Sequence, residues 1–517
     1  MSYLPTLLSS KVSAPHWHRI GVYPHHGFCL HLASLLSEES LGIGEFFDLL
    51  PLIDWARHIG LDVIQLLPIH DTGFDPSPFN PTSSCALNPV YLRLTKLPDL
   101  YELDGIQSKL KALQDCNRSS HVPFAEVKRR KLSLLKDYFR RHQKNLHHAH
   151  AFQAFFHKNP WLTEYGLFQA IQKDPIFPKP PEKELFHLMK IHADELQFQS
   201  FVQYLCYEQM QEVKRYATEK RVFLKGDIPL SVSLESADVW FHGDLFNVNL
   251  IAGAPPDMYN AQGQLWGSPL YNWTEHKNRN YFWWTRRLQE AEKLFHLYRM
   301  DHVVGYFRIW GIPPGKKAMD GAFVCNNRYL WPEHGREKLN MLLQSSYMLP
   351  IAEDLGTIPG EVYATLKDLG IPGTKIPRWS RYEQEDGSLI KPRDYDPVSL
   401  TSVSTHDSET LRQWWENNPL EAKEFAATRS WRYETKCTSN IREKLLQDAH
   451  KTPSLFHINL LQEYLALFEE LTHKDPLQER INVPGLNLDT NWTYRFLPKV
   501  EAIISHNELT NFMRSLL

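Results

Sequence analysis

Short apolar runs that end in polar or charged residues and are followed by Gly or Pro recur along the chain. Runs of about four to eight residues with such boundaries are typical of buried strands. Eight runs are candidate strands, and they cover residues 27–32, 63–69, 222–227, 297–301, 348–353, 373–377, 400–407 and 481–485.

Most of these runs are separated by stretches in which apolar residues recur three or four positions apart, which predicts helices. These stretches are 46–58, 284–295, 336–344 and 359–369. Alternation of strands and helices predicts a parallel sheet of the α/β class, and eight strands favour closure into a (β/α)8 TIM barrel. An open, doubly wound sheet is the alternative that the same pattern leaves open.

The interval between the second and third candidate strands is too long for a loop. Residues 95–215 therefore predict a mostly helical insertion subdomain, with the barrel formed by residues 1–94 and 216–517. The helical patterns of the insertion cover residues 124–143 and 184–216. A second segment, 245–280, is dense in Pro, Gly, Asn and aromatic residues. It predicts an irregular, lid-like insertion, because ordered loops of this size in enzymes often cover or bind the substrate.

Composition and charge narrow the choice of partners. The chain of 517 residues has 57 Lys and Arg against 60 Asp and Glu, a net charge of −3. This balance disfavours a nucleic-acid binder and an acidic disordered tail. Apolar residues make up 42% of the chain, enough for a large core, yet no stretch approaches the roughly 18 apolar residues of a membrane helix. We expect no nucleic acid and no membrane as a partner; the oligomeric state is not predicted.

Cysteine spacing and the N-terminus indicate the compartment. The six cysteines lie far apart without a C-x-x-C pair, so we expect neither a disulfide framework nor a zinc ribbon. The first 20 residues lack the continuous apolar stretch of a secretory signal. Both features favour a cytoplasmic protein.

Phosphate-loop, H-E-x-x-H and G-x-S-x-G motifs in their required settings are missing, and we expect neither a metal nor a cofactor.

Among the candidate strands that end in an acid, those ending at Asp301, Glu353 and Asp407 are the candidates for chemistry. The carboxyl ends of barrel strands meet at one face, where the chemistry of such enzymes gathers. Paired carboxylates there fit cleavage of a glycosidic bond, with one as nucleophile and the other as acid and then base. For any single strand-end acid, a helix N-cap or a structural hydrogen bond is the competing interpretation. Three such acids on one barrel make that interpretation weaker.

The neighbours of these acids suggest their roles. Arg299 and Asp301 are two residues apart on one strand, so their side chains share a face. A fixed guanidinium favours an ionised carboxylate, as a nucleophile requires, although a plain buried ion pair is the alternative. Glu353 follows an apolar stretch, where desolvation would raise its pKa as a general acid requires. His406 beside Asp407 could hold two adjacent sugar hydroxyls.

Aromatic residues form a second layer of candidates. Trp266 lies in the 245–280 segment, and sugar rings stack on indole faces, so it is the candidate platform for a glucan. For a Trp on a helix or a strand, packing in the core is the safer interpretation.

Ten motifs, in order from about residue 27 to 496, resemble those of the 4-α-glucanotransferases (amylomaltases or disproportionating enzymes). This is glycoside hydrolase family 77 of the α-amylase clan. The motifs lie at 42–46, 77–79 with 88–89, 226–230, 236–240, 253–257, 263–271, 299–302, 352–356, 405–407 and 482–485. Among them are Arg-Met-Asp-His at 299–302 and Ala-Glu-Asp-Leu-Gly at 352–356. They do not cover the 95–215 insertion.

The resemblance implies a (β/α)8 barrel without a C-terminal β-sandwich and without a cofactor. It implies retaining transfer of α-1,4-glucan segments from a maltodextrin donor to the 4-hydroxyl of glucose or another α-glucan. By motif match, Asp301 would be the nucleophile, Glu353 the acid and base, and Asp407 the stabiliser of the distorted sugar ring. The residues expected to bind substrate are Arg299, His302, His406, Asp257, Trp266, Ser77 and Asn482.

The chain departs from the family pattern at three places, which bear on acceptor preference and donor length. Val303-Val304-Gly305 follows the Asp-His pair, Phe79 stands where many members have Tyr, and Ser408-Glu409 follows Asp407. An α-glucan hydrolase of the same clan and a non-catalytic glucan-binding protein remain as alternatives. The choice of transfer over hydrolysis depends mainly on the resemblance.

Overall fold

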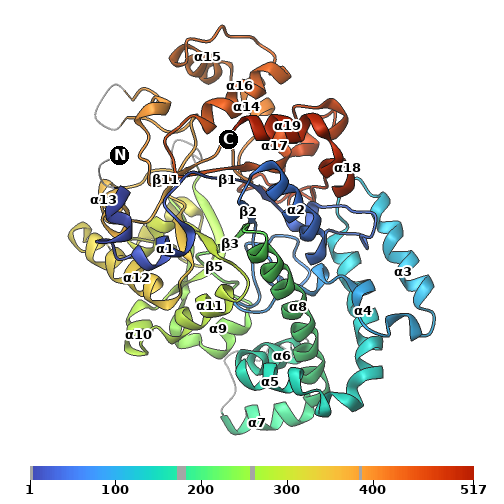
Figure 1. Ribbon diagram of the computed structural model, residues 1–517. Helices are drawn as coiled ribbons and strands as arrows, with labels where there is room; N and C mark the ends of the chain where they lie inside the picture. Colours follow the sequence, from blue (N-terminus) through green and yellow to red (C-terminus); the bar gives the residue numbers. More distant parts are fainter. Residues whose placement is uncertain (1–3, 172–181, 257–261, 326, 383–386) are drawn as a thin grey trace.

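Eight parallel strands form the central sheet of the computed structural model, which describes residues 4–171, 182–256, 262–325, 327–382 and 387–517 (Figure 1). The strands are β1 (His25–Leu30), β2 (Val63–Leu66), β3 (Phe223–Ile228), β6 (Leu297–Met300), β9 (Leu349–Ala352), β10 (Gly373–Lys375), β11 (Ser399–Thr401) and β12 (Phe456–Leu460). Their order in the sheet is β10-β11-β12-β1-β2-β3-β6-β9.

The two outer strands of this order, β9 and β10, meet and bring the sheet close to a closed barrel. The backbone N–H of Ala352 donates to the Pro372 carbonyl at 2.7 Å, and the Thr374 hydroxyl donates to the Ala352 carbonyl at 2.8 Å. The prediction of a (β/α)8 barrel is confirmed, and the open doubly wound sheet is excluded.

The eighth strand was predicted in the wrong place. Residues 481–485 form no strand, and Phe456–Leu460 supplies β12. Pro484 has no N–H for a ladder, whereas β12 hides two polar residues, His457 and Asn459, among buried positions. Asn459 is satisfied inside the fold, because its Oδ1 accepts the Val403 N–H at 2.9 Å. A buried strand that contains polar residues lacks the apolar run that predicts such a strand from sequence.

Helices surround the barrel and follow most of its strands (Figure 1). Those outside the long interval between β2 and β3 are α1 (Ala14–Ile20), α2 (Leu49–Ile59), α9 (Ala237–Phe241), α10 (Trp273–Asn278), α11 (Phe282–Glu292), α12 (Trp331–Ser345), α13 (Gly360–Leu369), α14 (Leu411–Asn417), α15 (Pro419–Thr428), α16 (Ser439–His450), α17 (Leu461–Leu465), α18 (Val500–Ser505) and α19 (Asn507–Ser515). The last helix, α19, packs against α2. The hydroxyl of Thr510 in α19 accepts a hydrogen bond from the Trp55 indole of α2 at 2.9 Å.

The interval between β2 and β3 is helical, as expected. It contains α3 (Ile106–Asp115), α4 (Phe124–His142), α5 (His150–Lys158), α6 (Trp161–Ile171), α7 (Glu182–Ile191) and α8 (Ala193–Glu219), and we call these six helices the insertion. The helical pattern at 184–216 is divided between α7 and α8. Its limits as a subdomain at residues 95 and 215 remain a prediction.

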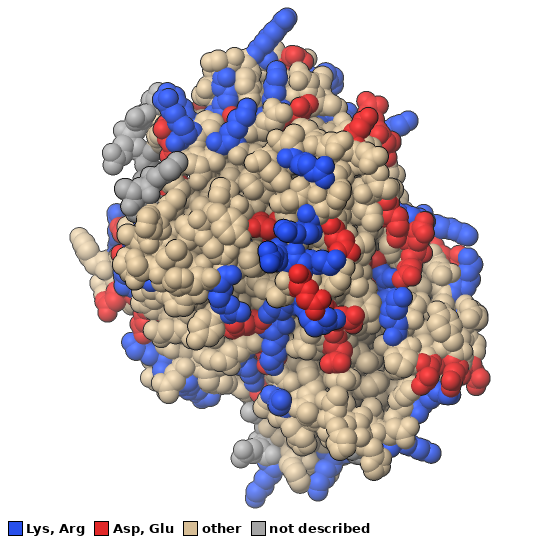
Figure 2. Space-filling view, in the orientation of Figure 1, with Lys and Arg blue, Asp and Glu red and all other residues tan. Residues whose placement is uncertain are grey.

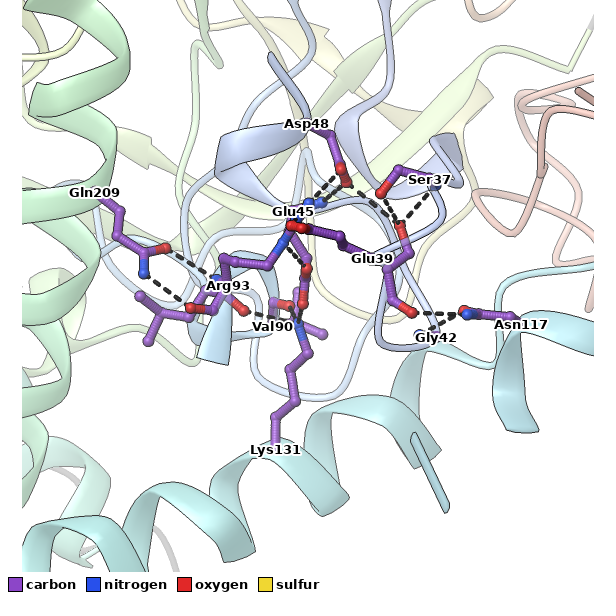
Figure 3. Close-up of polar contacts among 12 residues, drawn as sticks. Ser37, Glu39, Gly42, Glu45, Asp48, Val90, Arg93, Asn117, Lys131 and Gln209 are labelled. Atoms are coloured by element: carbon purple, nitrogen blue, oxygen red, sulfur yellow. Dashed lines mark hydrogen bonds and ion pairs between the residues drawn. The ribbon is translucent and has the colours of Figure 1, made fainter. Parts of the chain in front are cut away.

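A buried ion-pair network joins the insertion to the barrel (Figure 3). Lys131 of α4 donates to Glu45 at 2.5 Å, and both side chains are fully buried. Arg93 pairs with Glu45 and Asp48 in the same cluster. A buried charge without partners is costly, so this network fixes α4 against the segment that precedes α2.

The 245–280 segment was expected to be irregular, but its described residues form the two strands of a β-hairpin, followed by α10. β4 (Phe246–Ala254) and β5 (Gln264–Tyr271) are antiparallel, and a second sheet continues through β7 (Trp310–Ile312) and β8 (Ala322–Phe323). The pairing of β4 with β5 has register shifts, and several of its side chains are exposed. Irregular pairing and exposed faces obscure the alternation that predicts a strand.

Acidic and basic side chains are mixed over the face shown in Figure 2. Among the helices that the structure describes, none is both long and apolar enough to span a membrane.

Candidate active site

Two acids meet at one guanidinium where neighbouring strands end. In the parallel pair β6–β9, Met300 lies opposite Ala352, so the next residues, Asp301 and Glu353, leave the barrel side by side. Arg299 Nη1 contacts Asp301 Oδ1 at 2.7 Å, and Arg299 Nη2 lies 3.7 Å from Glu353 Oε2. The arrangement that the Arg-x-Asp spacing predicted is present.

Glu353 is held by the backbone on both carboxylate oxygens. Oε2 accepts the N–H of His302 at 2.9 Å, and Oε1 accepts the N–H of Leu355 at 3.0 Å. Burial nevertheless raises the pKa of Glu353 to about 7; Arg299 opposes this shift, and the charge of Asp301 adds to it. A substantial fraction of the Glu353 carboxyl groups is therefore protonated near neutral pH, as a general acid requires.

Asp407 belongs to a second cluster, built on the segment after β11. Its Oδ1 accepts a hydrogen bond from Asn482 Nδ2 at 2.7 Å, and its Oδ2 lies 3.3 Å from His406 Nε2. Desolvation works against ionisation of Asp407, but His406, Asn482 and Arg299 outweigh it and lower the pKa to about 2. The side chain is 45% exposed, so substrate can reach an ionised carboxylate.

His302 and Trp266 meet beside the first two acids. The ring of His302 makes an edge-to-face contact with the Trp266 indole, with centroids 4.7 Å apart. Burial lowers the pKa of His302 to about 4, so the imidazole is neutral at pH 7. His302 also has a φ of 44°, a left-handed conformation that is uncommon for a residue with a side chain. This conformation follows directly after Asp301, where the chain turns away from β6.

Asp227 was missed by the sequence reasoning, although it ends a candidate strand as Asp301 does. It lies opposite Arg299 in the β3–β6 pair, and Arg299 Nη1 lies 3.0 Å from its Oδ1. Asp227 is buried, and burial raises its pKa while Arg299 opposes the shift. The strand-end pattern was the signal that could have identified it.

Phe79 was noted only as a departure from the family pattern, yet it connects the two clusters. Its ring stacks on His406 with centroids 4.8 Å apart, and the Arg299 guanidinium lies 5.7 Å from the ring centre. Ser77 lies in the same loop, where its N–H donates to Asp75 at 2.9 Å. A role of Ser77 in substrate binding stays a prediction. Spacing along the sequence carries no signal for the stacking of Phe79.

Asp257, predicted to bind substrate, lies outside the described residues. Among the residues that are described, no group of three His, Cys, Asp or Glu side chains is placed to hold a metal ion.

A (β/α)8 barrel with carboxylates grouped around one arginine at its strand ends defines a class: barrel enzymes that act on glycosidic bonds. The profile of the 4-alpha-glucanotransferase family matches residues 30–500. The chain is 41% identical to the 4-alpha-glucanotransferase of Chlamydia pneumoniae, over 98% of this chain and 97% of the relative. The chain therefore belongs to the 4-alpha-glucanotransferase family.

Solved structures agree with this assignment. An amylomaltase from Streptococcus agalactiae in complex with acarbose matches with a TM-score of 0.80 and 25% identity, covering 95% of this chain and 98% of its own. The amylomaltase of Corynebacterium glutamicum has the same fold, with a TM-score of 0.78 and 21% identity over 95% of this chain and 75% of its own. The predicted 4-α-glucanotransferase is supported over the hydrolase and the non-catalytic binding protein.

Proposed function

We propose that this 4-α-glucanotransferase moves α-1,4-glucan segments from a maltodextrin donor to the 4-hydroxyl of glucose or another α-glucan by retaining double displacement. The observation that carries the proposal is the contact of one arginine, Arg299, with both Asp301 and Glu353 at neighbouring strand ends. In a retaining enzyme the two carboxyl groups flank one glycosidic bond.

In the first step, an oxygen of the ionised Asp301 attacks the anomeric carbon of the donor. The glycosidic C–O bond breaks, and Glu353 gives its proton to the leaving oxygen. Arg299 contacts Asp301 and orients it for this attack. Asp407, with its lowered pKa, binds hydroxyls of the distorted ring through an ionised carboxylate.

In the second step, Glu353 acts as a base and takes the proton of the acceptor 4-hydroxyl. The acceptor oxygen attacks the anomeric carbon, and the bond to Asp301 breaks. Two inversions at one carbon leave the α configuration unchanged. Transfer requires that a sugar rather than water intercepts the intermediate. The β4–β5 hairpin supports this outcome, because it places Trp266 against His302 beside the acids.

Incubation with maltotriose tests the proposed function. Glucose together with oligomers longer than maltotriose supports transfer. Glucose and maltose without longer products would identify a hydrolase, and binding without turnover would identify a non-catalytic glucan-binding protein.

We also infer a cytoplasmic location. All six cysteines are free, and five of them are buried, as expected for a protein in a reducing compartment.

A further inference from the structure

The loop of residues 67–88 forms the side of the site that carries Phe79. Pairing of His70 with Leu87 and a 2.8 Å hydrogen bond from Asp71 N to the Ala86 carbonyl close the base of this loop. Phe79 lies between these ends, where it stacks on His406 and lies under Arg299. The position of the loop therefore sets the position of the aromatic ring that connects the two acid clusters.

The base of the loop is held by the insertion through one buried carboxylate, that of Asp71. Lys128 of α4 pairs with Asp71 Oδ1, and the hydroxyl of Tyr165 of α6 donates to Oδ2 at 2.6 Å. Gln169, also of α6, donates to Oδ2 at 3.4 Å. Three side chains from two helices of the insertion thus converge on a single residue of the active-site loop.

Lys128 holds the loop at a second point. Its Nζ also donates to the Gly73 carbonyl at 2.5 Å, and Gly73 has a φ of 61°, at the turn that leads toward Phe79. The cation lies 5.8 Å from the centre of the Phe74 ring. One ammonium group therefore ties the start of the turn to α4 by an ion pair, a backbone hydrogen bond and a ring contact.

These groups are shielded from water. Asp71 is 2% exposed, Lys128 3% and Tyr165 2%. Buried ion pairs are weakly screened and directional, so they hold a geometry more firmly than surface pairs do.

We infer that Lys128 and Tyr165 are positioning residues for glucan transfer: through Asp71 they fix the loop that presses Phe79 against His406 and Arg299. The inference rests on the proposed function of the site and deepens it. It gives the insertion a role in the reaction, because the helices that carry Lys128 and Tyr165 do not themselves contain the acids.

The chain offers a matched control on the same helix. Lys131 lies three residues after Lys128 on α4 and is also fully buried, but it pairs with Glu45 and donates to the Val90 and Leu92 carbonyls (Figure 3). It fixes α4 to Glu45 and to the residues that follow the loop, whereas Lys128 binds Asp71 and Gly73 inside the loop. Lys131→Met should lower stability while leaving kcat/KM per folded enzyme within about twofold of wild type.

The test is a double-mutant cycle on maltotriose disproportionation. Lys128→Met and Tyr165→Phe are each measured in the wild-type and the Phe79→Ala backgrounds, with active-site concentration corrected for folded protein. A displacement of about 1 Å at a reacting site can lower rates about 100-fold. We expect Lys128→Met to lower kcat/KM roughly 10- to 100-fold and Tyr165→Phe several-fold, mainly through kcat. In the Phe79→Ala background both losses should shrink to less than about twofold, since the residue through which they act is absent.

Three outcomes would overturn the inference: no loss in the folded variants, a loss of equal size in both backgrounds, or an equal loss in Lys131→Met. If Lys128→Met does not fold, Tyr165→Phe decides the test, because it removes only a hydroxyl. Failure of the proposed function is a separate result, since wild-type enzyme would then form no oligomers longer than maltotriose.

Discussion

Arg299 determines the electrostatics of the site because three carboxylates share its charge. It contacts Asp227, Asp301 and Glu353 at the ends of three consecutive barrel strands. Mutual attraction raises the pKa of Arg299 even though the group is desolvated. The cation favours the ionised form of the carboxylates around it, but the burial of Glu353 outweighs this effect and raises its pKa to about 7.

The raised pKa of Glu353 predicts how activity and stability depend on pH. If Glu353 is the acid, kcat/KM falls as pH rises above about 7, because the carboxyl group loses the proton that the leaving oxygen needs. In the unfolded chain the same group ionises near pH 4.5, so between 4.5 and about 7 the fold holds a proton that the unfolded chain releases. Raising pH through this window therefore lowers stability.

Two measurements check this prediction. The pH profile of kcat/KM should have its alkaline limb near pH 7. Glu353→Gln, which cannot ionise, should unfold at a higher temperature than wild type at pH 8, and the difference should shrink at pH 5. A difference that does not change with pH would show that Glu353 is not desolvated.

Asp301→Asn should abolish transfer with little effect on the fold. The change removes the proposed nucleophile but almost no volume, and Arg299 keeps Asp227 and Glu353 as partners. We expect kcat to fall by roughly a thousandfold or more, while maltodextrin binding and the melting temperature remain close to wild type. Retained turnover would assign the nucleophile to another residue.

Strands and helices could be predicted where the buried residues are apolar and follow the period of a strand or a helix. Seven of the eight barrel strands and the helices at 46–58 and 359–369 follow directly from apolar runs and helical periodicity. β12 was missed because His457 and Asn459 point into a hydrogen-bonded interior. The β4–β5 hairpin was missed because its register shifts and exposed side chains hide the alternation of a strand, and because β4 also pairs with β7, about 60 residues further on.

The hairpin should favour transfer over hydrolysis through Trp266. An aromatic contact of this kind contributes about 0.5–1.5 kcal/mol, so Trp266→Ala should raise KM for maltotriose roughly 2- to 10-fold. It should also increase the share of free glucose that is not matched by longer oligomers, because water gains access to the intermediate. Product analysis by chromatography measures both effects.

Leu265→Ala is the matched control for this prediction. Leu265 precedes Trp266 on β5, is 55% exposed, and projects from the opposite face of the strand. Its removal should leave the product ratio unchanged. An equal change in both variants would mean that the hairpin acts through its backbone rather than through the indole.

At the scale of the molecule, the insertion and the barrel are joined by buried charges rather than by apolar packing alone. Lys131 and Glu45 have no exposed surface. Lys131→Met leaves Glu45 buried beside Arg93 with one cation fewer, and removing one partner of such a pair costs about 3–5 kcal/mol. Denaturant unfolding should show this loss, and the double variant Lys131→Met/Glu45→Gln should recover part of it. A double variant less stable than either single variant would contradict this interpretation.

The sequence predicted only part of the site, because some of its contacts join segments that lie far apart along the chain. Asp301, Glu353 and Arg299 follow from strand ends and the two-residue period, which are local properties. Asn482 reaches Asp407 from a segment 75 residues further along the chain, so only the family motif pointed to it. The stacking of Phe79 on His406 joins loops more than 300 residues apart, and no periodicity encodes it.

The most direct test of retaining transfer through Asp301 is to trap the glycosyl intermediate on the enzyme. Glu353→Gln is incubated with a maltosyl fluoride, whose leaving group departs without an acid, and the protein is digested and examined by mass spectrometry. We expect a covalent glycosyl adduct on the peptide that carries Asp301. An adduct on Asp407 or Asp227, or none at all while fluoride is released, would contradict it.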